Sequence, residues 1–440
     1  MQSSQKRDSF KSRAGFIWAC VGSAVGMGNI WLFPYRVGQL GGAAFLIPYF
    51  IAVALLGYSG VIEEMAFGRA MRSGPIGAFE KVMSRRGLKG GAILGYIPVV
   101  GALGIAVGYS VVVGWIIKFF VQSASGLVTS APDSGAFFGA VAGPMGSLGW
   151  HTAAILLTLF VMAAGVSRGI ERLNKAIMPL FFLMFALLAL RVAFLPGALD
   201  GYKFLVHPDF QVLWTPKTWV YALGQAFFSL SIAGSGTLVY GSYLKDDVDI
   251  VSSAKSVAFF DTVAALLAAV VILPATFAHQ VAPTAGPPLM FIVMPEIFKG
   301  IPASALFCTI FFFAALCAGL TSLVNLYEAP IEALQNRFGL SRAASVAVIT
   351  LAGLALGIAL EDGARLGAWM DLISIYVLPL GALLAAVMFF WIGGSGFAAD
   401  QIRLGRNGNL SPLIVPLGKY VFCGLTILVF VMGIRLGGIG

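Results

Sequence analysis

Long apolar runs separated by short polar loops constrain this chain more than any other feature. A helix that crosses a bilayer needs roughly 20 mostly apolar residues, and the 440-residue sequence contains about eleven such runs. Charged residues make up 11% of the chain, against about 25% in a typical soluble domain. A soluble fold has too little interior to bury this much apolar surface. We therefore predict an all-α polytopic membrane protein, and we exclude a secreted disulfide scaffold, a nucleic-acid-binding protein and a soluble enzyme.

The expected spans are residues 14–38, 42–69, 91–122, 152–168, 175–195, 218–243, 255–280, 303–335, 343–360, 366–394 and 411–436. Basic residues concentrate in alternate loops, above all in the N-terminal segment and the loop after the second span. Because cytoplasmic loops carry an excess of Lys and Arg, we expect a multi-pass protein of the cell inner (plasma) membrane with a cytoplasmic N-terminus. The four cysteines lie singly in apolar runs and are expected to be packing residues.

Two external segments have compositions of their own. Residues 123–150 are rich in Gly, Ser, Ala and Pro, which predicts an irregular loop. Residues 281–302 are apolar but rich in proline, which predicts a folded-over segment that can cap a cavity. The three histidines, His151, His207 and His279, all fall in expected external segments. No clustered metal or triad chemistry is visible, so we do not expect an enzyme.

One glycine pattern occurs twice, in two different spans. The first span contains Ser-x-x-Gly-x-Gly beginning at Ser23, and the sixth span repeats it beginning at Ser231. Glycine inside a helix costs about 1 kcal/mol relative to alanine, so the two patterns predict local unwinding. Unwound backbone at membrane depth is tolerated only where it lines a cavity or is buried in protein. Its free carbonyls can bind a cation and its free N–H groups an anion, so matched breaks predict a transporter's binding site. The alternative is close helix packing through small residues.

The position of the two breaks also predicts how the chain is organised. Each break lies in the first helix of a group of five spans, and five is an odd number, so the second group must run inverted in the membrane. The expected segments are a cytoplasmic N-terminal segment (1–13), a first five-helix repeat (14–195), an external loop (196–217), a second inverted repeat (218–394), and a loop with an accessory eleventh helix (395–440).

Several stretches carry a resemblance to a known family. They are GSAVGMGNIWLFPY (22–35), GGAAFLIPY (41–49), EMAFGR (64–69), SRGIERLNKAIMP (167–179), GQAFFSLS (224–231), YGSYLKDDVDIV (240–251) and AGLTSLVNLYEAP (318–330). Here the sequence resembles the neurotransmitter:sodium symporter family, and in particular bacterial amino-acid transporters such as the bacterial leucine transporter. The resemblance implies the leucine-transporter (LeuT-type) fold: two inverted five-helix repeats with broken first and sixth helices, and accessory helices. It also implies that the chain couples sodium entry to the uptake of an amino acid or amine.

The resemblance assigns two sodium sites, all of whose ligands are hard oxygen donors suited to a small alkali cation. The first would use the Ala24 carbonyl, the Asn29 side chain, Ser229 and Asp261, and the substrate carboxylate would complete it. The second would use the carbonyls of Gly22, Val25 and Ala318 with the hydroxyls of Thr321 and Ser322. From the residues alone, the two hydroxyls could equally bond back to their own helix.

The same resemblance assigns a substrate site. The carboxylate would meet the Gly28 N–H and the Tyr109 hydroxyl. The ammonium group would face the carbonyls of Ala24, Phe228 and Ser229, with help from Ser231. The pocket for the side chain would be lined by Ile105, Tyr109, Phe228, Gly234, Ser322, Asn325 and Leu326. Gly234 stands where the bacterial leucine transporter has a bulky residue, so we expect it to widen the pocket.

The expected gates depart from the family pattern. Leu32 stands where the family has an outer-gate arginine, while the acid, Asp371, is present. Arg36, one turn beyond Leu32, could replace the missing cation; the alternative is a purely aromatic gate. At the cytoplasmic gate Arg7 is kept, but Asn336 stands where an acid is expected. Glu332, one turn away, could substitute for it.

These assignments lead to one function with alternatives. We expect a sodium-coupled symporter with two sodium sites that imports a neutral, hydrophobic or aromatic L-amino acid by alternating access. Because Asp261 supplies a fixed negative charge, we expect no chloride requirement, and proton counter-transport becomes possible. The alternatives are a membrane amino-acid sensor that does not transport, and a transporter of the same fold with another coupling ion. The expected partners are the amino acid and the lipid bilayer, with no nucleic acid and no obligatory protein partner.

Overall fold

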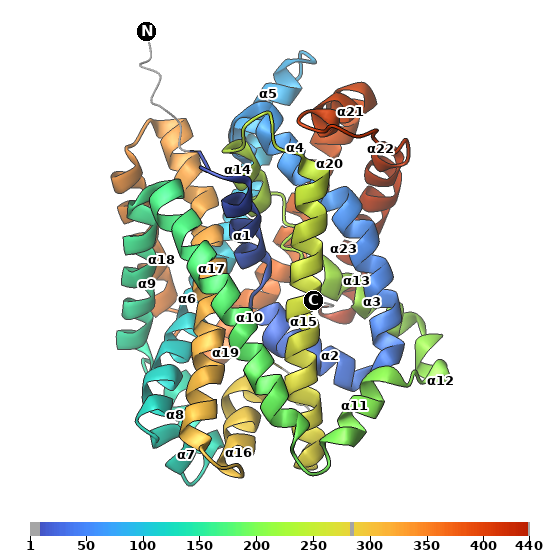
Figure 1. Cartoon of the computed structure of the whole chain (residues 1–440). Helices are drawn as coiled ribbons and strands as arrows, with labels where there is room; N and C mark the ends of the chain where they lie inside the picture. Colours follow the sequence, from blue (N-terminus) through green and yellow to red (C-terminus); the bar gives the residue numbers. More distant parts are fainter. Residues whose placement is uncertain (1–8, 282–285, 439–440) are drawn as a thin grey trace.

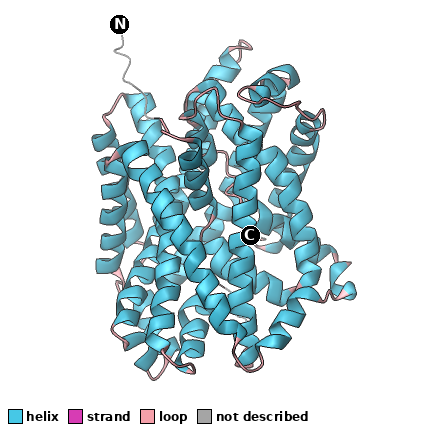
Figure 2. Cartoon of the chain, in the orientation of Figure 1, coloured by secondary structure: helices cyan, strands magenta, loops and turns pink. Residues whose placement is uncertain are grey.

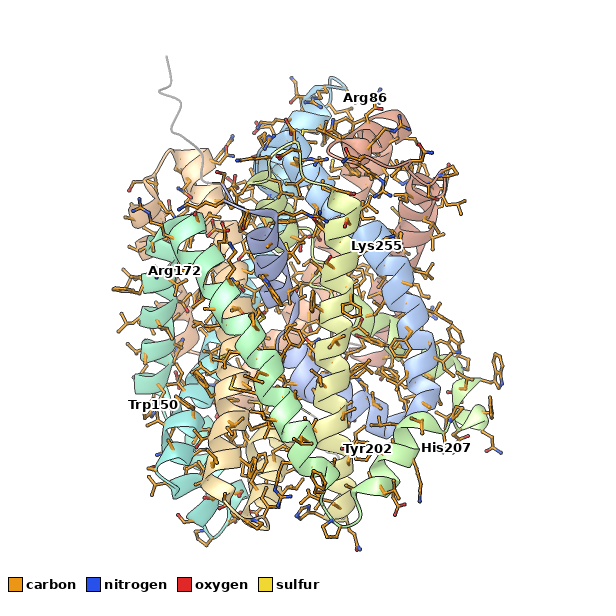
Figure 3. All side chains as sticks on the ribbon, in the orientation of Figure 1. Arg86, Trp150, Arg172, Tyr202, His207 and Lys255 are labelled. Atoms are coloured by element: carbon orange, nitrogen blue, oxygen red, sulfur yellow. The ribbon has the colours of Figure 1, made fainter. Side chains whose placement is uncertain are left out.

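The computed structural model describes residues 9–281 and 286–438. The regular elements in these two ranges are all helices (Figure 2). They form a bundle in which α5, α21 and α22 lie together at one end (Figure 1). The short helices α7, α8, α11, α12 and α16 lie toward the opposite end (Figure 1). In Figure 3, Arg86 lies at the first of these ends, whereas Tyr202 and His207 lie at the other.

Both predicted breaks are present. The first span consists of α1 (Arg13–Ala24), a π-helical turn η1 (Gly28–Leu32) and α2 (Phe33–Gln39), and its two parts meet at 55°. The sixth span consists of α13 (Pro216–Ser229) and α14 (Gly236–Ser242). Between these two helices the chain is not helical, and Ser231 and Gly234 have positive φ angles of 53° and 71°.

Within the described ranges, seven helices are long and apolar enough to cross a membrane. They are α3–η2–α4 (Ala43–Leu56, Gly57–Val61, Ile62–Met71), α6 (Gly91–Ala124), η3–α10 (Val166–Glu171, Arg172–Ala193), α15 (Ile250–Ala278), α17 (Ser304–Phe338), α19–η5–α20–η6 (Gly363–Leu372, Ile373–Val377, Leu378–Ala386, Val387–Ile392) and α22–η7–α23 (Ile414–Pro416, Leu417–Phe422, Cys423–Leu436). Two shorter apolar helices, α9 (Leu148–Ala163) and α18 (Arg342–Ile358), occupy the fourth and ninth expected spans. With the two broken spans, these helices account for the eleven spans expected from the sequence.

Short helices lie outside the spans. They are α5 (Pro75–Ser84), α7 (Leu127–Ser130), α8 (Ser134–Ala142), α11 (Ala198–Val206), α12 (Phe210–Leu213), η4 (Leu289–Val293), α16 (Met294–Lys299) and α21 (Ser395–Arg403). The prediction of an irregular loop at 123–150 was therefore wrong, because this stretch contains α7 and α8. The Asp133 side chain accepts hydrogen bonds from two N–H groups at the start of α8, an N-cap that stabilises a short helix despite its small residues.

The segment 281–302 folds back onto the bundle over its described part, as predicted. Phe291 of η4 stacks on Phe138 of α8, with ring centroids 5.0 Å apart and an interplanar angle of 4°. The Glu296 carboxylate accepts a hydrogen bond from the Ser134 N–H and forms an ion pair with Lys299. These contacts hold the pKa of Glu296 below its usual range, even though burial acts in the opposite direction.

The histidine prediction was wrong for one of the three. His151 lies in the first turn of α9 and is fully buried, whereas a loop position would have left it accessible. The fourth span begins at Leu148 rather than at residue 152, so that His151 falls inside the helix. The four cysteines are buried and free, in agreement with their expected packing role.

Close backbone contact holds α4 against α14, the second half of the broken sixth span. A Cβ atom added to Gly68 would lie 1.9 Å from the Leu238 carbonyl oxygen, so only glycine fits between the two backbones. This contact fixes the position of α14 relative to the intact second span.

We predict that Gly68→Ala destabilises the protein by about 1–3 kcal/mol, because overpacking forces the two backbones apart. Gly367→Ala is the matched control, since Gly367 also lies in a helix but has no atom within 4 Å of the added Cβ. Thermal unfolding in detergent measures both variants. Equal melting temperatures for the two would contradict the proposed backbone contact.

Candidate functional site

The first break redirects backbone hydrogen bonds onto side chains. The Gly26 N–H donates to the Asn29 Oδ1 (3.0 Å), and the Met27 N–H donates to the Tyr109 hydroxyl (3.0 Å). In an unbroken helix these two groups would bond the carbonyls of Gly22 and Ser23. The Ser23 carbonyl accepts instead from the hydroxyls of Ser231 (2.9 Å) and Ser322 (3.3 Å).

The second break is held by an acid that the sequence did not single out. Glu64 of α4 is buried, and its Oε1 accepts hydrogen bonds from the N–H groups of Ala233 (3.0 Å) and Gly234 (2.6 Å). The available signal was an acidic residue in the middle of an apolar span, which is costly and therefore functional by default. A carboxylate satisfies two orphaned donors at once, which explains its position beside the break.

Gly234 has a different role from the one predicted. It does not belong to the described residues that line the cavity, so it does not widen the pocket directly. Its φ is +71°, and an added Cβ would lie 2.4 Å from the Gly381 carbonyl oxygen. Glycine is therefore required here for the turn and for close packing against α20.

Three side chains predicted for the first sodium site meet beside the breaks. The Asp261 carboxylate, fully buried on α15, accepts from the Asn29 Nδ2 (2.8 Å) and from the Ser229 hydroxyl (2.7 Å). Asn29 Nδ2 also lies 3.1 Å from the Ser229 hydroxyl. The carboxylate and hydroxyl oxygens of Asp261 and Ser229 are donors that fit a hard alkali cation, whereas Asn29 faces them with its Nδ2 and keeps its Oδ1 on the Gly26 N–H. Gln225 supports the site from α13, since its Nε2 donates to the Gly28 carbonyl (3.1 Å).

Gly22 and Thr321, both predicted for the second sodium site, lie close to each other where α1 passes α17. A Cβ added to Gly22 would lie 2.9 Å from the Thr321 Cβ, so the two backbones are close. The Thr321 hydroxyl bonds to Cys317 O (3.0 Å) and Ala318 O (3.1 Å) of its own helix, the alternative that the sequence left open. Ser322 instead reaches across to the first break. Val25 is buried at the end of α1, within the unwound segment.

Asn174 of α10 also touches this region and was not predicted. Its Oδ1 would lie 1.8 Å from a Cβ on Gly22, and that oxygen is buried without a partner among the described residues. The sequence held no signal for it, because a single Asn in a span is an ordinary packing residue.

A cavity of about 230 Å³ lies between the two breaks. Ten of the eleven residues predicted for the substrate site line it: Ala24, Gly28, Ile105, Tyr109, Phe228, Ser229, Ser231, Ser322, Asn325 and Leu326. They come from α1, η1, α6, α13, the second break and α17. The lining is apolar on the sides formed by Ile105, Phe228 and Leu326, and it includes residues of both breaks.

The predicted outer-gate pair lines the same cavity, but the two side chains are not paired. Arg36 and Asp371 both contribute to the wall, and the ion pairs formed by the described residues do not include one between them. The Arg36 guanidinium lies 4.0 Å from the centroid of the Tyr221 ring, and it donates to the Gln39 Oε1. At the other gate, Asn336 donates to the Glu332 Oε1 (3.1 Å), and Arg7 lies outside the described residues.

Comparison with known proteins identifies the family. The model of the "Sodium:neurotransmitter symporter family" matches residues 7–130 and 140–403. The chain belongs to the sodium:neurotransmitter symporter family. It is similar to an uncharacterized sodium-dependent transporter, YhdH, of Bacillus subtilis, with 39% identity over 329 residues, covering 74% of this chain and 72% of the relative. It is 28% identical over 305 residues to the rat sodium-dependent neutral amino acid transporter B(0)AT3, covering 61% of this chain and 47% of that protein.

A solved structure has the same fold as this chain. The crystal structure of MhsT in complex with L-phenylalanine superposes with a TM-score of 0.87 at 33% identity, covering 97% of this chain and 99% of the other. The chain is thus a multi-pass membrane protein with the leucine-transporter fold and belongs to a family of sodium-dependent transporters rather than enzymes. The predictions of fold, family and absence of enzymatic activity are confirmed.

We predict that Glu64→Ala accelerates amide hydrogen exchange in residues 230–235 by roughly tenfold or more, because a hydrogen bond to a charged group contributes about 1.5–3 kcal/mol. Glu63→Gln is the matched control, since Glu63 is the adjacent buried acid and neither of its oxygens has a partner among the described residues. Mass spectrometry of the peptide that covers the break measures both. If Glu63→Gln accelerates amide exchange in residues 230–235 as much as Glu64→Ala does, the proposed role of Glu64 is wrong.

Proposed function

We propose that this chain is a sodium-coupled symporter that imports a neutral, hydrophobic or aromatic L-amino acid by alternating access. The observation that carries the proposal is the cavity between the two breaks, which adjoins the Asn29–Ser229–Asp261 cluster through Ser229. One wall of the cavity therefore belongs to a set of oxygen donors suited to sodium. The similar MhsT structure was solved with L-phenylalanine, which supports an amino-acid substrate of this class.

We assign sodium to two sites. Asn29, Ser229, Asp261 and the Ala24 carbonyl would bind the first ion together with the substrate carboxylate. The carbonyls of Gly22, Val25 and Ala318 and the hydroxyls of Thr321 and Ser322 would bind the second. At the second site the Thr321 hydroxyl can keep donating its proton to a carbonyl of its own helix, while the lone pairs of its oxygen face the ion.

The ends of the half-helices orient the zwitterion. The Gly28 N–H begins η1, where unsatisfied N–H groups favour an anion, so it would hold the substrate carboxylate together with the Tyr109 hydroxyl. The ammonium group would face the carbonyls of Ala24, Phe228 and Ser229. Ser231 acts indirectly, since its hydroxyl already bonds the Ser23 carbonyl and ties the two breaks together.

The pocket lining favours an apolar side chain. Ile105, Phe228 and Leu326 present hydrocarbon, and each methylene that is buried contributes about 0.8 kcal/mol. Asn325 adds one amide to this wall and favours a substrate whose side chain also carries a hydrogen-bonding group. Arg36 and Asp371 stand at the outer part of the cavity, where we propose that they pair when the outer side closes.

We place the protein in the cell inner membrane with the N-terminus in the cytoplasm, on the basis of the basic loops. The cytoplasmic gate would use Arg7 with Glu332, the acid next to Asn336. Import then follows the sodium gradient, and no chloride is required because Asp261 supplies the negative charge.

We predict that L-phenylalanine stabilises the protein only in sodium, because the ion and the carboxylate share a site. Asn29→Ala should weaken sodium binding and amino-acid binding by the same factor, since coupling between two ligands is reciprocal. Thermal-shift titrations in sodium and in choline buffer measure the affinities for sodium and for L-phenylalanine. The control variant is Asn407→Ala, because Asn407 lies in an exposed loop. Equal stabilisation in choline would exclude sodium coupling. Binding without sodium-driven uptake into proteoliposomes would favour the sensor.

We further predict that sodium-driven uptake continues when chloride is replaced by gluconate. The fixed charge of Asp261 offsets the sodium ion, so a bound anion is unnecessary. Asp261→Asn removes that charge and should abolish uptake in gluconate. When sodium leaves, Asp261 can take up a proton, and counter-transport would make uptake depend on the lumenal pH of the vesicles. Undiminished uptake by Asp261→Asn in gluconate would contradict the role of this carboxylate.

A further inference from the structure

A second buried polar network lies apart from the substrate cavity, on the side of α6 that faces α9. His151 Nε2 lies 2.9 Å from the Ser110 hydroxyl, and His151 Nδ1 lies 2.9 Å from the Glu361 Oε1. The Ser147 hydroxyl donates to the other oxygen of Glu361, and the Trp115 Nε1–H donates to Ser147 (3.0 Å). Each of these five side chains is at most 2% exposed.

The network is built around the imidazole ring. A Cβ added to Gly357 of α18 would lie 2.4 Å from the His151 Cε1, and one added to Gly114 of α6 would lie 2.6 Å from the His151 N. Gly357 leaves room for the ring, and Gly114 leaves room for the α9 backbone that carries it. The order Ser110–His151–Glu361 is that of a hydrolase triad, but Ser110 is fully buried and is not part of the described cavity wall. Ser110 therefore cannot attack a substrate in the cavity. The network can instead bind or release protons.

Hydrogen-bond accounting allows one extra proton on the network. When the Ser110 hydroxyl donates its only proton to the Val107 carbonyl (2.7 Å), the His151 Nε2 donates to Ser110. His151 Nδ1 faces a carboxylate and must donate as well. The ring then carries two protons and forms a neutral ion pair with Glu361. In agreement with this, the pKa of Glu361 is lowered: burial raises it, but the bonds from His151 and Ser147 outweigh burial.

We propose that His151 and Glu361 form a proton-binding site in which the bound proton sets the direction of the Ser110 hydroxyl. When the Nε2 proton leaves for the solution, Nδ1 still donates to Glu361 and the pair carries one negative charge. The bare Nε2 then accepts a hydrogen bond, and the Ser110 hydroxyl turns away from Val107 to supply it. Every polar atom keeps a partner in both states, so the site can titrate without unfolding.

The surroundings contain further titratable groups. Lys118 of α6 donates to the Gly146 carbonyl beside Ser147 (3.5 Å), and Asp362 follows Glu361 and caps α19. Tyr327 of α17 lies close to Ser110, and its hydroxyl packs against Gly353 of α18. Among the described residues, His151 and Ser147 are the side chains that lower the pKa of Glu361, against the effect of burial. The proton is therefore shared by His151 and Glu361, and histidine is the side chain that changes charge between about pH 5 and 8.

The site joins two helices that line the cavity. α6 carries Ser110 next to Tyr109, and Glu361 lies just before Asp362, the N-cap of α19, whose Asp371 lines the cavity. A second bond links the same helices, since the Trp369 Nε1–H donates to the Gly104 carbonyl (2.7 Å). A change of charge at Glu361 therefore acts on the position of α19 relative to α6, and so on the outer side of the cavity.

The chain contains only three histidines, which makes the site directly observable. With His207→Gln and His279→Gln, and a purification tag without histidine, His151 is the only imidazole. We expect ¹⁵N NMR of the ring to show two protonated nitrogens at low pH and one at high pH, with Nδ1 protonated in both. Glu361→Gln should lower the transition by about one pH unit or more, because the opposite charge is lost.

Ser110→Ala should also lower the transition, by less, because a charged N–H donor loses its acceptor. Tyr327→Phe is the control, and the pH of its NMR transition should be close to that of the parent protein. A ring whose protonation is constant from about pH 5 to 9, or a transition unmoved by both Glu361→Gln and Ser110→Ala, would overturn the proton site. These measurements do not depend on the proposed transport function.

A second experiment tests the link to the cavity and does rest on that function. The affinity for L-phenylalanine in saturating sodium should change across the NMR transition in the parent. It should be constant over the same pH range in His151→Gln and shifted with the NMR transition in Ser110→Ala. An affinity in the parent that does not follow the transition would refute the link between the proton and the cavity.

Discussion

Backbone groups inside a membrane must find hydrogen-bond partners within the protein, and this structure depends on how that requirement is met at two places. Two spans are interrupted, and an interruption leaves N–H and C=O groups without their helical partners. Here side chains from other spans supply them: Tyr109 at the first break and Glu64 at the second. The cavity exists because these side chains stabilise an open backbone that lipid would not tolerate.

The same requirement is met by three of the buried acids. Asp261, Glu64 and Glu361 are all buried, and each accepts hydrogen bonds from at least two donors. A buried charge is retained only when it is paired, bonded or neutralised. Asp261 stands where a cation is proposed, Glu64 faces backbone donors, and Glu361 faces an imidazole. Three acids therefore have three different roles, which follow from their neighbours rather than from their residue type.

The sequence predicted the features that follow from local rules. Apolar length predicted the spans, and the repeated glycine pattern predicted both breaks, because glycine weakens a helix wherever it occurs. The residues around the cavity came from the family resemblance, and ten of the eleven assigned to the substrate line it. Glu64, Asn174 and His151 could not be placed, because each contacts a helix more than a hundred residues away in sequence. Gly234 was misinterpreted for a related reason: its environment is the Gly381 carbonyl, which no local pattern reveals.

The Ser23 carbonyl has a consequence for how water reaches the centre of the protein. A carbonyl oxygen has two lone pairs, and here the hydroxyls of Ser231 and Ser322 occupy both. No water molecule can bond this oxygen until one of the hydroxyls leaves, and those hydroxyls belong to the second break and to α17. Water can therefore bond the Ser23 carbonyl only when α1 separates from the second break or from α17.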